Sequence, residues 1–352
     1  MSLYKSELWI SDIDRVIEAN PCISTLSGKS VMITGINGLV CSAIADILIR
    51  YNETHDLPVI IFAAGRSEKR IKERFDKYFE RNYFCYIAYD ATSPYFDCPL
   101  TADYIIHGAS NSSPDRITKE PVETILSNII GLNALLNYAK NRGVERLLYI
   151  SSSEIYGAKE DNKPYKEGQY GFIDLLKSRS SYSVGKRAAE TLCVSYSDEY
   201  DIESVIIRPG HIYGPTATKE DKHVSSQWAY AAARGEDIVM KSEGSQLRSY
   251  CYCLDAASAI LTALIKGENN QAYNISNPDS VISIKEMAQV LANSAGVQLK
   301  MELPTNDERK GFNPMSNSSL DGSNLITLGW KCVFDDIDGF GHTVEILKDI
   351  LC

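Results

Sequence analysis

The sequence lacks several features that mark whole classes of proteins. It has no block of Lys and Arg residues, and its formal net charge is -10 over 352 residues, so we expect no nucleic-acid-binding surface. No apolar run approaches the roughly 18 residues that span a bilayer. The N-terminus also lacks a basic region followed by an apolar one. We therefore expect neither membrane contact nor a secretory signal.

Cysteine and histidine are present but not grouped. The nine Cys are scattered and form no C-x-x-C pair, so we expect reduced thiols and a cytoplasmic location. The five His are too dispersed to suggest a metal site. With 44% hydrophobic and 23% charged residues, the composition is that of a globular chain that buries a large core.

Apolar runs alternate with helical patterns along the chain, which predicts an α/β fold with a Rossmann-like, doubly wound parallel sheet. The predicted dinucleotide-binding domain is 28–208, and the chain returns to it near 235–265. Residues 209–352 are predicted to form mainly a smaller α/β substrate-binding domain. A polar extension, 1–27, with a short helix around Asp12–Ala19, either caps the first domain or contributes to a dimer.

Candidate site residues follow the ends of several predicted strands. The predicted strands are Ser30–Thr34, Pro58–Ala63, Tyr83–Tyr89, Tyr104–His107, Leu147–Ile150, Ser204–Ile207 and Ala272–Ile275. The later predicted helices are 121–141, 225–234, 255–266 and 283–295. In open α/β sheets, ligands bind at the carboxyl ends of the strands, so the residues after each strand are the first candidates for a site.

A glycine turn follows the first strand. The sequence Gly35-Ile36-Asn37-Gly38-Leu39 leads into a helical pattern. Gly35 suits a tight turn, and Gly38 lets the backbone approach a pyrophosphate at the helix N-terminus. The third small position holds Cys41, a compact replacement for glycine. This context predicts a dinucleotide-binding turn.

The ends of the next three strands extend the predicted cofactor site. NAD-binding folds usually place an Asp or Glu after the second strand. This chain has Arg66 and Ser67 there, which suit a 2′-phosphate and favour NADP over NAD. Asp90 and the adjoining Ala91 are placed to hydrogen bond the adenine. The small residues after the fourth strand let backbone pass close to the cofactor; they are Gly108, Ala109 and Ser110.

A tyrosine and a lysine four residues apart follow the fifth strand. On a helix, Tyr182 and Lys186 share one face. A nearby ammonium favours the phenolate, so we expect Lys186 to lower the pKa of Tyr182 and make it a base for a sugar hydroxyl. The strand Leu147–Ile150 runs into Ser151-Ser152-Ser153-Glu154, which supplies hydroxyls and one carboxylate.

Taken together, these pieces resemble the extended short-chain dehydrogenase/reductase family that remodels nucleotide sugars, from about residue 28 to the end. The matching motifs are T-G-I-N-G, Asp90, H-G-A-S, S-S-S-E-I-Y-G, Y-S-V-G-K, R-P-G-H-I-Y-G-P and G-S-Q-L-R. The resemblance implies tightly bound, recycled NAD or NADP, a nucleotide-diphosphate sugar as substrate, and a homodimer.

Three residues help to discriminate within that family. Ser152-Ser153-Glu154 is most similar to the Thr-Ser-Glu of UDP-glucuronate decarboxylases and GDP-mannose 4,6-dehydratases. The 4-epimerases have Ser-Ala-Thr there, and dTDP-glucose 4,6-dehydratases have Thr-Asp-Glu. The chain departs from the family in having Ser152 for Thr, His211 for Asn, and no acidic residue before Arg66.

The resemblance assigns roles in a reaction through a 4-keto sugar. Tyr182 takes the 4-hydroxyl proton, Ser152 holds that oxygen, and Lys186 also binds the nicotinamide ribose. Glu154, with Ser153 beside it, acts at C5 in a 6-dehydration or in protonation after decarboxylation. The alternatives are a 4-epimerase, against which Glu154 argues, and a cofactor sensor without chemistry, against which the complete Ser152, Tyr182 and Lys186 set argues.

The remaining predicted site residues fall into two groups. The cofactor group is completed by Asn37, Leu39, Asn128, Pro209 and, in a second role, Tyr182. The substrate group is Ser112, Arg179, His211 and Arg248, of which Arg248 and Arg179 are expected to hold the diphosphate or a sugar carboxylate.

Overall fold

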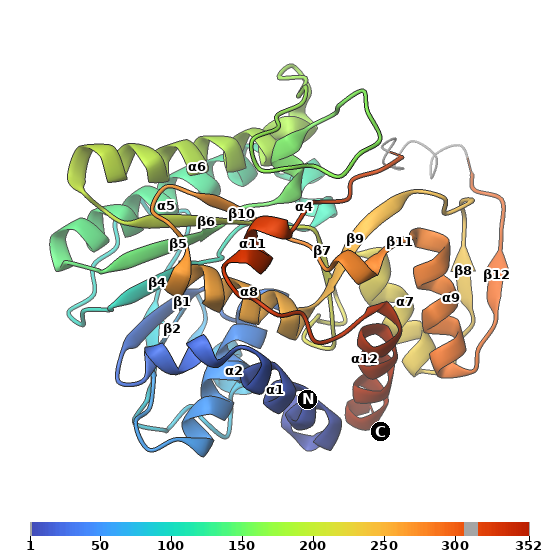
Figure 1. Cartoon of the computed structure of the whole chain (residues 1–352), viewed down its shortest axis with the longest axis horizontal. Helices are drawn as coiled ribbons and strands as arrows, with labels where there is room; N and C mark the ends of the chain where they lie inside the picture. The colour runs from blue at the N-terminus through green and yellow to red at the C-terminus, as the bar shows by residue number, and fades with distance from the viewer. Residues whose placement is uncertain (1, 306–315, 352) are drawn as a thin grey trace.

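A parallel sheet of seven strands forms the centre of the computed structural model, which describes residues 2–305 and 316–351 (Figure 1). Its strand order is β10-β6-β5-β4-β1-β2-β3. The strands are β1 Ser30–Thr34, β2 Ile60–Gly65, β3 Phe84–Ala88, β4 Tyr104–His107, β5 Arg146–Ile150, β6 Ser204–Pro209 and β10 Ala272–Ile275. The order reverses between β1 and β4, where such sheets bind ligands. The predicted Rossmann-like α/β fold is therefore confirmed.

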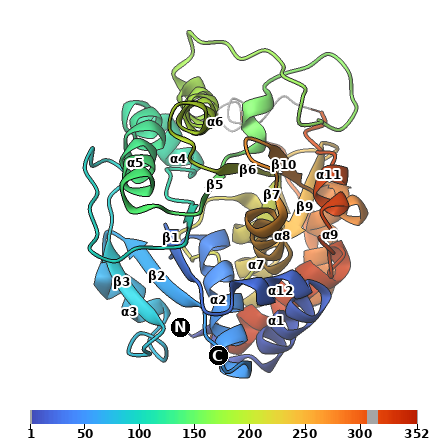
Figure 2. The same ribbon diagram turned by 60° about the vertical axis from the view of Figure 1, so that its left-hand side comes forward.

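Helices cover both faces of this sheet, so its inner strands are buried along nearly their whole length. Every residue of β1 is buried. Figure 2 shows α5 and α6 on one side and α2 and α8 on the other. The helices around the main sheet are α2 Leu39–Thr54, α3 Glu68–Arg74, α4 Pro114–Lys119, α5 Pro121–Arg142, α6 Ser181–Tyr200 and α8 Cys253–Lys266.

Within the described residues, the later part of the chain adds two small sheets and the helices α7, α9, α11 and α12 beside the main sheet (Figure 1). One sheet has the order β11-β9-β7, and the other pairs β12 with β8. The strands are β7 His211–Tyr213, β8 Ile238–Met240, β9 Leu247–Tyr252, β11 Val281–Ser283 and β12 Leu299–Met301. The helices are α7 Val224–Ala233, α9 Ile284–Ala295, α11 Ser323–Thr327 and α12 Asp336–Leu351. The domain boundary near residue 208 stays a prediction.

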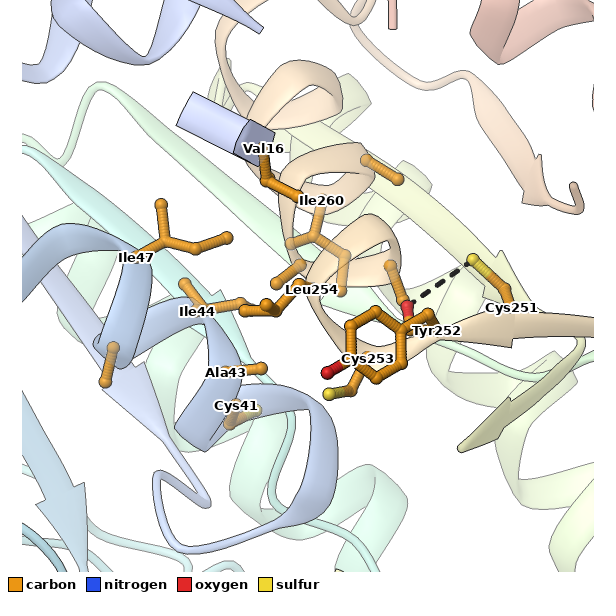
Figure 3. Close-up of a cluster of buried hydrophobic side chains, with 14 of the residues drawn as sticks. Val16, Cys41, Ala43, Ile44, Ile47, Cys251, Tyr252, Cys253, Leu254 and Ile260 are labelled. Atoms are coloured by element: carbon orange, nitrogen blue, oxygen red, sulfur yellow. Dashed lines mark hydrogen bonds between the residues drawn. The ribbon is translucent and has the colours of Figure 1, made fainter. Parts of the chain in front are cut away.

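The N-terminal segment differs from the polar extension that we expected. Helix α1, Glu7–Ala19, begins earlier than the predicted Asp12–Ala19, because Trp9 and Ile13 lie one turn apart on its buried face. Both side chains are fully buried. Figure 3 shows Val16 of α1 beside Ile260 of α8, with the α2 side chains Ile44 and Ile47 in the same cluster. The segment is therefore part of the hydrophobic core.

Two predicted strand boundaries also needed correction. Strand β2 begins and ends two residues after the predicted Pro58–Ala63, because the pairing with β1 starts at Ser30 and Ile60, and proline has no N–H to donate to a ladder. Strand β6 continues through Arg208 and Pro209, since β10 pairs with it as far as Pro209. The short strands β7, β8, β11 and β12 were not predicted as separate elements.

Candidate active site

The predicted site residues gather at the carboxyl ends of the parallel strands. The glycine turn follows β1, and Gly108–Ser110 follows β4. Ser152 follows β5 as the N-cap of the 3-10 helix η3, Ser153–Tyr156. Parallel strands end at the same edge of a sheet. The topology therefore brings together residues that lie more than a hundred positions apart in the sequence.

The turn after β1 and the turn after β4 pack backbone against backbone. Gly35 has a φ of 70°, and a Cβ on it would lie 2.9 Å from the N and Cα atoms of Ala109. A Cβ on Gly108 would lie 2.3 Å from the Sγ atom of Cys41. Cys41 therefore replaces the third glycine of the motif because Gly108 leaves room for its sulfur, and the predicted turn keeps its close packing.

Thr34 fixes the second of these turns, a role that the sequence analysis missed. Its Oγ1 atom accepts hydrogen bonds from the N–H groups of Gly108 at 3.2 Å and Ala109 at 3.3 Å. The same hydroxyl lies 2.7 Å from Nδ1 of His107, to which it donates its proton. Burial lowers the pKa of His107 to about 3, so this histidine is neutral.

A pocket of about 280 Å³ lies at the ends of β2 and β3. It brings the predicted Arg66 and Asp90 together, beside Tyr89 and Tyr95. Hydrogen bonds from Thr92 lower the pKa of Asp90, and the charge of Arg66 lowers it further. The Oγ atom of Ser67 accepts a hydrogen bond from the Arg70 N–H and caps α3. The pocket combines a cation, a carboxylate and aromatic rings, which suits the adenosine end of a dinucleotide.

Asn128 of α5 links the strand ends from the neighbouring helix. Its Oδ1 atom accepts hydrogen bonds from Ser110 Oγ at 3.0 Å and Tyr149 Oη at 3.2 Å. Its Nδ2 atom donates to the Thr124 carbonyl at 2.7 Å. Asn128 is buried, so this predicted cofactor residue holds Ser110 in place.

Tyr182, Ser152 and Lys186 lie together beneath the end of β5. The Ser152 hydroxyl lies near enough to the Tyr182 phenol to lower its pKa. The Nζ atom of Lys186 donates to the Ile150 carbonyl at 2.7 Å and lies 5.9 Å from the centre of the Tyr182 ring. Tyr182 and Lys186 are both buried. The structure thus assembles the three residues that the sequence placed in one reaction.

The pKa of Tyr182 is raised, and the expected lowering by Lys186 is wrong for this structure. Burial raises the pKa most, and the negative charge of Glu154 raises it further. Ser152 and Arg179 lower it by smaller amounts. Burial also lowers the pKa of Lys186 to about 7, against the influence of Glu190. A low-dielectric site disfavours the charged form of both groups.

Glu154 and Arg179 form a two-pronged ion pair at the mouth of the site. Both guanidinium NH groups donate to the carboxylate at 2.9 Å. Ser183 Oγ donates to the same carboxylate at 3.3 Å. The expected partner of Arg179 was a substrate anion, whereas here its partner is Glu154. The pair leaves the Glu154 carboxylate half exposed, at 40%, and fixed in orientation.

The predicted substrate residues His211 and Arg248 lie on neighbouring strands of the small sheet. His211 of β7 is paired with Tyr250 of β9, two residues after Arg248. Burial, with a smaller contribution from the charge of Arg248, lowers the pKa of His211 to about 3. A buried, neutral imidazole acts as a hydrogen-bonding group, as the Asn it replaces would. Its Nδ1 atom has no hydrogen-bond partner within the described part of the chain.

Two remaining predicted residues lie at the edges of the site. Pro209 ends β6 and pairs with Ile275. Ser112 is exposed in the loop before α4. Within residues 2–305 and 316–351, no group of three His, Cys, Asp or Glu side chains is arranged to hold a metal ion. Over the same residues, no helix has the length and apolar character needed to cross a membrane.

Glu190 and Arg208 are the largest omission of the sequence analysis. They form a buried ion pair behind Ser151, with 2.7 Å between Arg208 Nη2 and Glu190 Oε2. Both had a signal: Glu190 lies one turn after Lys186 on the same helix face, and Arg208 opens the quoted motif R-P-G-H-I-Y-G-P.

The glycine turn after β1, the pocket after β3 and the buried Tyr182–Lys186 pair define a dinucleotide-binding protein of the Rossmann type. The sequence model of the NAD dependent epimerase/dehydratase family matches residues 31–276. The chain belongs to this family, which confirms the resemblance drawn from its motifs.

Named relatives and solved structures show which enzymes this chain is similar to. UDP-glucuronic acid decarboxylase 6 of Arabidopsis thaliana is 31% identical over 307 residues, which cover 87% of this chain and 84% of that protein. Two solved structures share the fold. UDP-glucuronic acid 4-epimerase from Bacillus cereus, in complex with UDP-glucuronic acid and NAD, has a TM-score of 0.75 at 19% identity, covering 91% of this chain and 99% of that chain. RMD from Pseudomonas aeruginosa, complexed with NADPH, has a TM-score of 0.73 at 21% identity, covering 92% and 99%.

Proposed function

We propose that this chain is an NAD(P)-dependent nucleotide-sugar lyase that decarboxylates UDP-glucuronate through a 4-keto intermediate. The observation that carries the proposal is the gathering of Tyr182, Lys186 and Glu154 at the end of β5, where Lys186 donates to the Ile150 carbonyl and Ser183, beside Tyr182, donates to the Glu154 carboxylate. The relatives named UDP-glucuronic acid decarboxylase supply the substrate class. An enzyme that modifies nucleotide sugars was the expectation from the motifs, and the relatives agree with it.

The residues present fit a nicotinamide dinucleotide. The glycine turn leaves backbone open at the N-terminus of α2, and Asn37 Oδ1 is a buried acceptor without a partner in the described residues. Arg66 and Asp90 line the pocket for the adenosine end. We propose that Arg66 favours NADP by pairing with its 2′-phosphate. An oxidised nicotinamide ring supplies the electron acceptor for C4 and a positive charge that favours the Tyr182 phenolate.

The protein groups then have defined tasks at the sugar. Tyr182 Oη takes the proton of the 4-hydroxyl, while Ser152 Oγ holds the same oxygen. With C4 as a ketone, the C6 carboxylate belongs to a β-keto acid. Loss of CO₂ breaks the C5–C6 bond, and the electron pair passes into a C4–C5 enolate. C5 then takes up a proton, and Glu154 is the carboxyl group proposed to manage it. Tyr182 gives its proton back to the C4 oxygen as hydride returns to C4 from the reduced nicotinamide, so that the net change is the loss of CO₂ and the cofactor is recycled.

The test is to incubate the purified protein with NAD or NADP and, separately, UDP-glucuronate, dTDP-glucose, GDP-mannose and UDP-glucose. Products are read by mass. Loss of 44 Da, the mass of CO₂, from UDP-glucuronate is the expected result. Loss of 18 Da, the mass of water, from one of the other sugars would make the protein a 4,6-dehydratase and give Glu154 the C5 proton. An unchanged mass with a new sugar by NMR would make it a 4-epimerase, and the role given to Glu154 would be wrong.

The same incubations compare the two cofactors. Faster turnover with NADP is expected if Arg66 binds a 2′-phosphate, and equal or faster turnover with NAD would contradict that role. The homodimer and the cytoplasmic location expected from the sequence stay predictions.

A further inference from the structure

Arg208 is the most completely bonded charged side chain near the site. It is 2% exposed, and each of the five N–H groups of its guanidinium has an acceptor. Nε donates to Glu190 Oε1 at 3.0 Å, and Nη2 donates to Glu190 Oε2 at 2.7 Å and Tyr170 Oη at 3.0 Å. Nη1 donates to Tyr156 Oη at 3.0 Å and to the Glu167 carbonyl at 2.7 Å.

The partners of Arg208 lie on both sides of segment 152–155, which contains the predicted catalytic residues Ser152, Ser153 and Glu154. Upstream, Glu190 Oε1 accepts a hydrogen bond from Ser151 Oγ at 2.5 Å. Downstream, Tyr156 binds Arg208 directly and donates to Asn274 Oδ1 at 2.5 Å. The buried guanidinium of Arg208 therefore holds Ser151 indirectly, through Glu190. It holds Tyr156 directly, through a hydrogen bond.

The same carboxylate faces the active-site side of helix α6. Tyr182, Lys186 and Glu190 follow one another at intervals of four residues, so they share a helix face. Lys186 donates to the carbonyl of Ile150, the residue before Ser151. Glu190 also opposes the lowering of the Lys186 pKa by burial. The Arg208–Glu190 pair thus contacts Ser151 and Tyr156, and the charge of Glu190 raises the pKa of Lys186.

We propose that the Arg208–Glu190 pair is a positioning device that fixes both ends of segment 152–155 against Tyr182 and Lys186. The expected effect of this pair on turnover rests on the proposed function. Its expected effect on the order of segment 152–155 does not. A reactive geometry must be held within a fraction of an ångström, and buried, fully bonded groups hold it best. Neither residue touches the reacting atoms, so both act through Ser151, Tyr156 and Lys186.

Hydrogen exchange measures this positioning without any turnover. Glu190→Gln keeps the shape of the side chain but removes the charge, and Ser151→Ala removes only the upstream bond. We expect the amides of residues 150–157 to exchange about 10-fold faster in both variants. The matched control is Asp46→Asn, which disturbs another buried ion pair, that of Asp46 and Arg74 between α2 and α3. It should leave exchange in 150–157 unchanged.

Turnover gives the second readout. Glu190→Gln and Ser151→Ala should lower kcat about 10–100-fold, as a small displacement of reacting groups does, with KM and cofactor Kd changed less than about 3-fold. Asp46→Asn should lower stability and leave kcat unchanged. If Glu190→Gln fails to fold, Tyr156→Phe tests the downstream bond in the same way.

The outcomes separate the two proposals. Unchanged exchange in 150–157 in Ser151→Ala and Tyr156→Phe would overturn the positioning role, as would loss of stability with unaltered kcat. A wild-type protein that turns over none of the sugars would remove the proposed function, while the exchange result would still decide the positioning role.

Discussion

At Tyr182, the environment and the proposed task of the residue oppose each other. Burial and the charge of Glu154 raise the pKa of the phenol, whereas a base must lose its proton near neutral pH. Ser152 and Arg179 offset part of this effect. The phenol is therefore protonated in the ligand-free site, and a positive charge brought next to it on cofactor binding would complete its activation.

Replacing Tyr182 by Phe removes one oxygen and keeps the ring. We expect turnover to fall by about 10²–10⁴-fold, because the proton acceptor is lost, while the cofactor Kd stays the same since Lys186 remains. Steady-state kinetics and cofactor titration measure the two effects. Tyr196→Phe is the control, because Tyr196 lies on the same helix and its hydroxyl bonds Asn133 at 2.8 Å, outside the site. Full activity of Tyr182→Phe would remove the proposed chemistry.

At the scale of elements, helix α1 bridges the main sheet and the C-terminal helix. Asp14 pairs with Arg50 of α2 through two hydrogen bonds of 2.7 and 2.8 Å. Asp12, fully buried, accepts a hydrogen bond from Tyr252 of β9 at 3.1 Å and lies 2.9 Å from His342 of α12. Figure 1 shows α1 between α2 and α12. The N-terminal segment thus joins the main sheet and its helices to the later part of the chain, which contains β9 and α12.

The His342–Asp12 contact makes this bridge sensitive to pH. The hydrogen bond and charge of Asp12 raise the pKa of His342, which Asp338 also raises, while burial and Arg15 lower it. A histidine with a raised pKa contributes stability that is complete below its unfolded pKa of about 6.5 and is lost as the pH rises through the folded pKa. The bridge should therefore be weaker at pH 8 than at pH 6.

Urea unfolding at the two pH values checks this prediction. We expect His342→Gln to cost about 1–2 kcal/mol at pH 6, from a hydrogen bond to a charged group, and less at pH 8. Amides of α1 should lose protection in parallel. His55→Gln, at the exposed end of α2, is the control. An equal cost of His342→Gln at both pH values would mean that the charge of the histidine has no part in the bridge.

At the scale of the whole molecule, one continuous hydrophobic cluster runs from α1 through α2 and α8 to α9 and α12. Trp9 is a fully buried member of this cluster and packs edge to face on Tyr252, with ring centroids 6.4 Å apart. A shared core predicts that the two parts unfold together instead of as separate domains.

Trp9→Ala tests this cooperativity. Removal of a fully buried indole should lower the free energy of unfolding by about 3–5 kcal/mol, in a single transition seen alike by far-UV CD and tyrosine fluorescence. Leu57→Ala, whose side chain is 59% exposed, should change stability by less than about 0.5 kcal/mol. Two separate transitions in the Trp9 variant would show that the parts are independent.

Local patterns in the sequence determined much of this protein. The glycine turn, the apolar strands and the spacing of Tyr182 and Lys186 are set by neighbouring residues, because tight turns and shared helix faces depend on short-range geometry. The alternation of strands and helices and the Tyr182–Lys186 pair were predictable for that reason, whereas Ser152 was added to the pair through the family resemblance of its motif.

Only the tertiary structure decided what depends on partners distant in the sequence. The place of α1 in the core, the pairing of Glu154 with Arg179, and the Arg208 network each join segments that only the fold brings together. The raised pKa of Tyr182 belongs here as well, since burial sets it. The spacing along the chain was enough to propose Tyr182 and Lys186 as a catalytic pair. The dielectric surroundings of the pair and the residues that hold it in place are properties of the packed molecule.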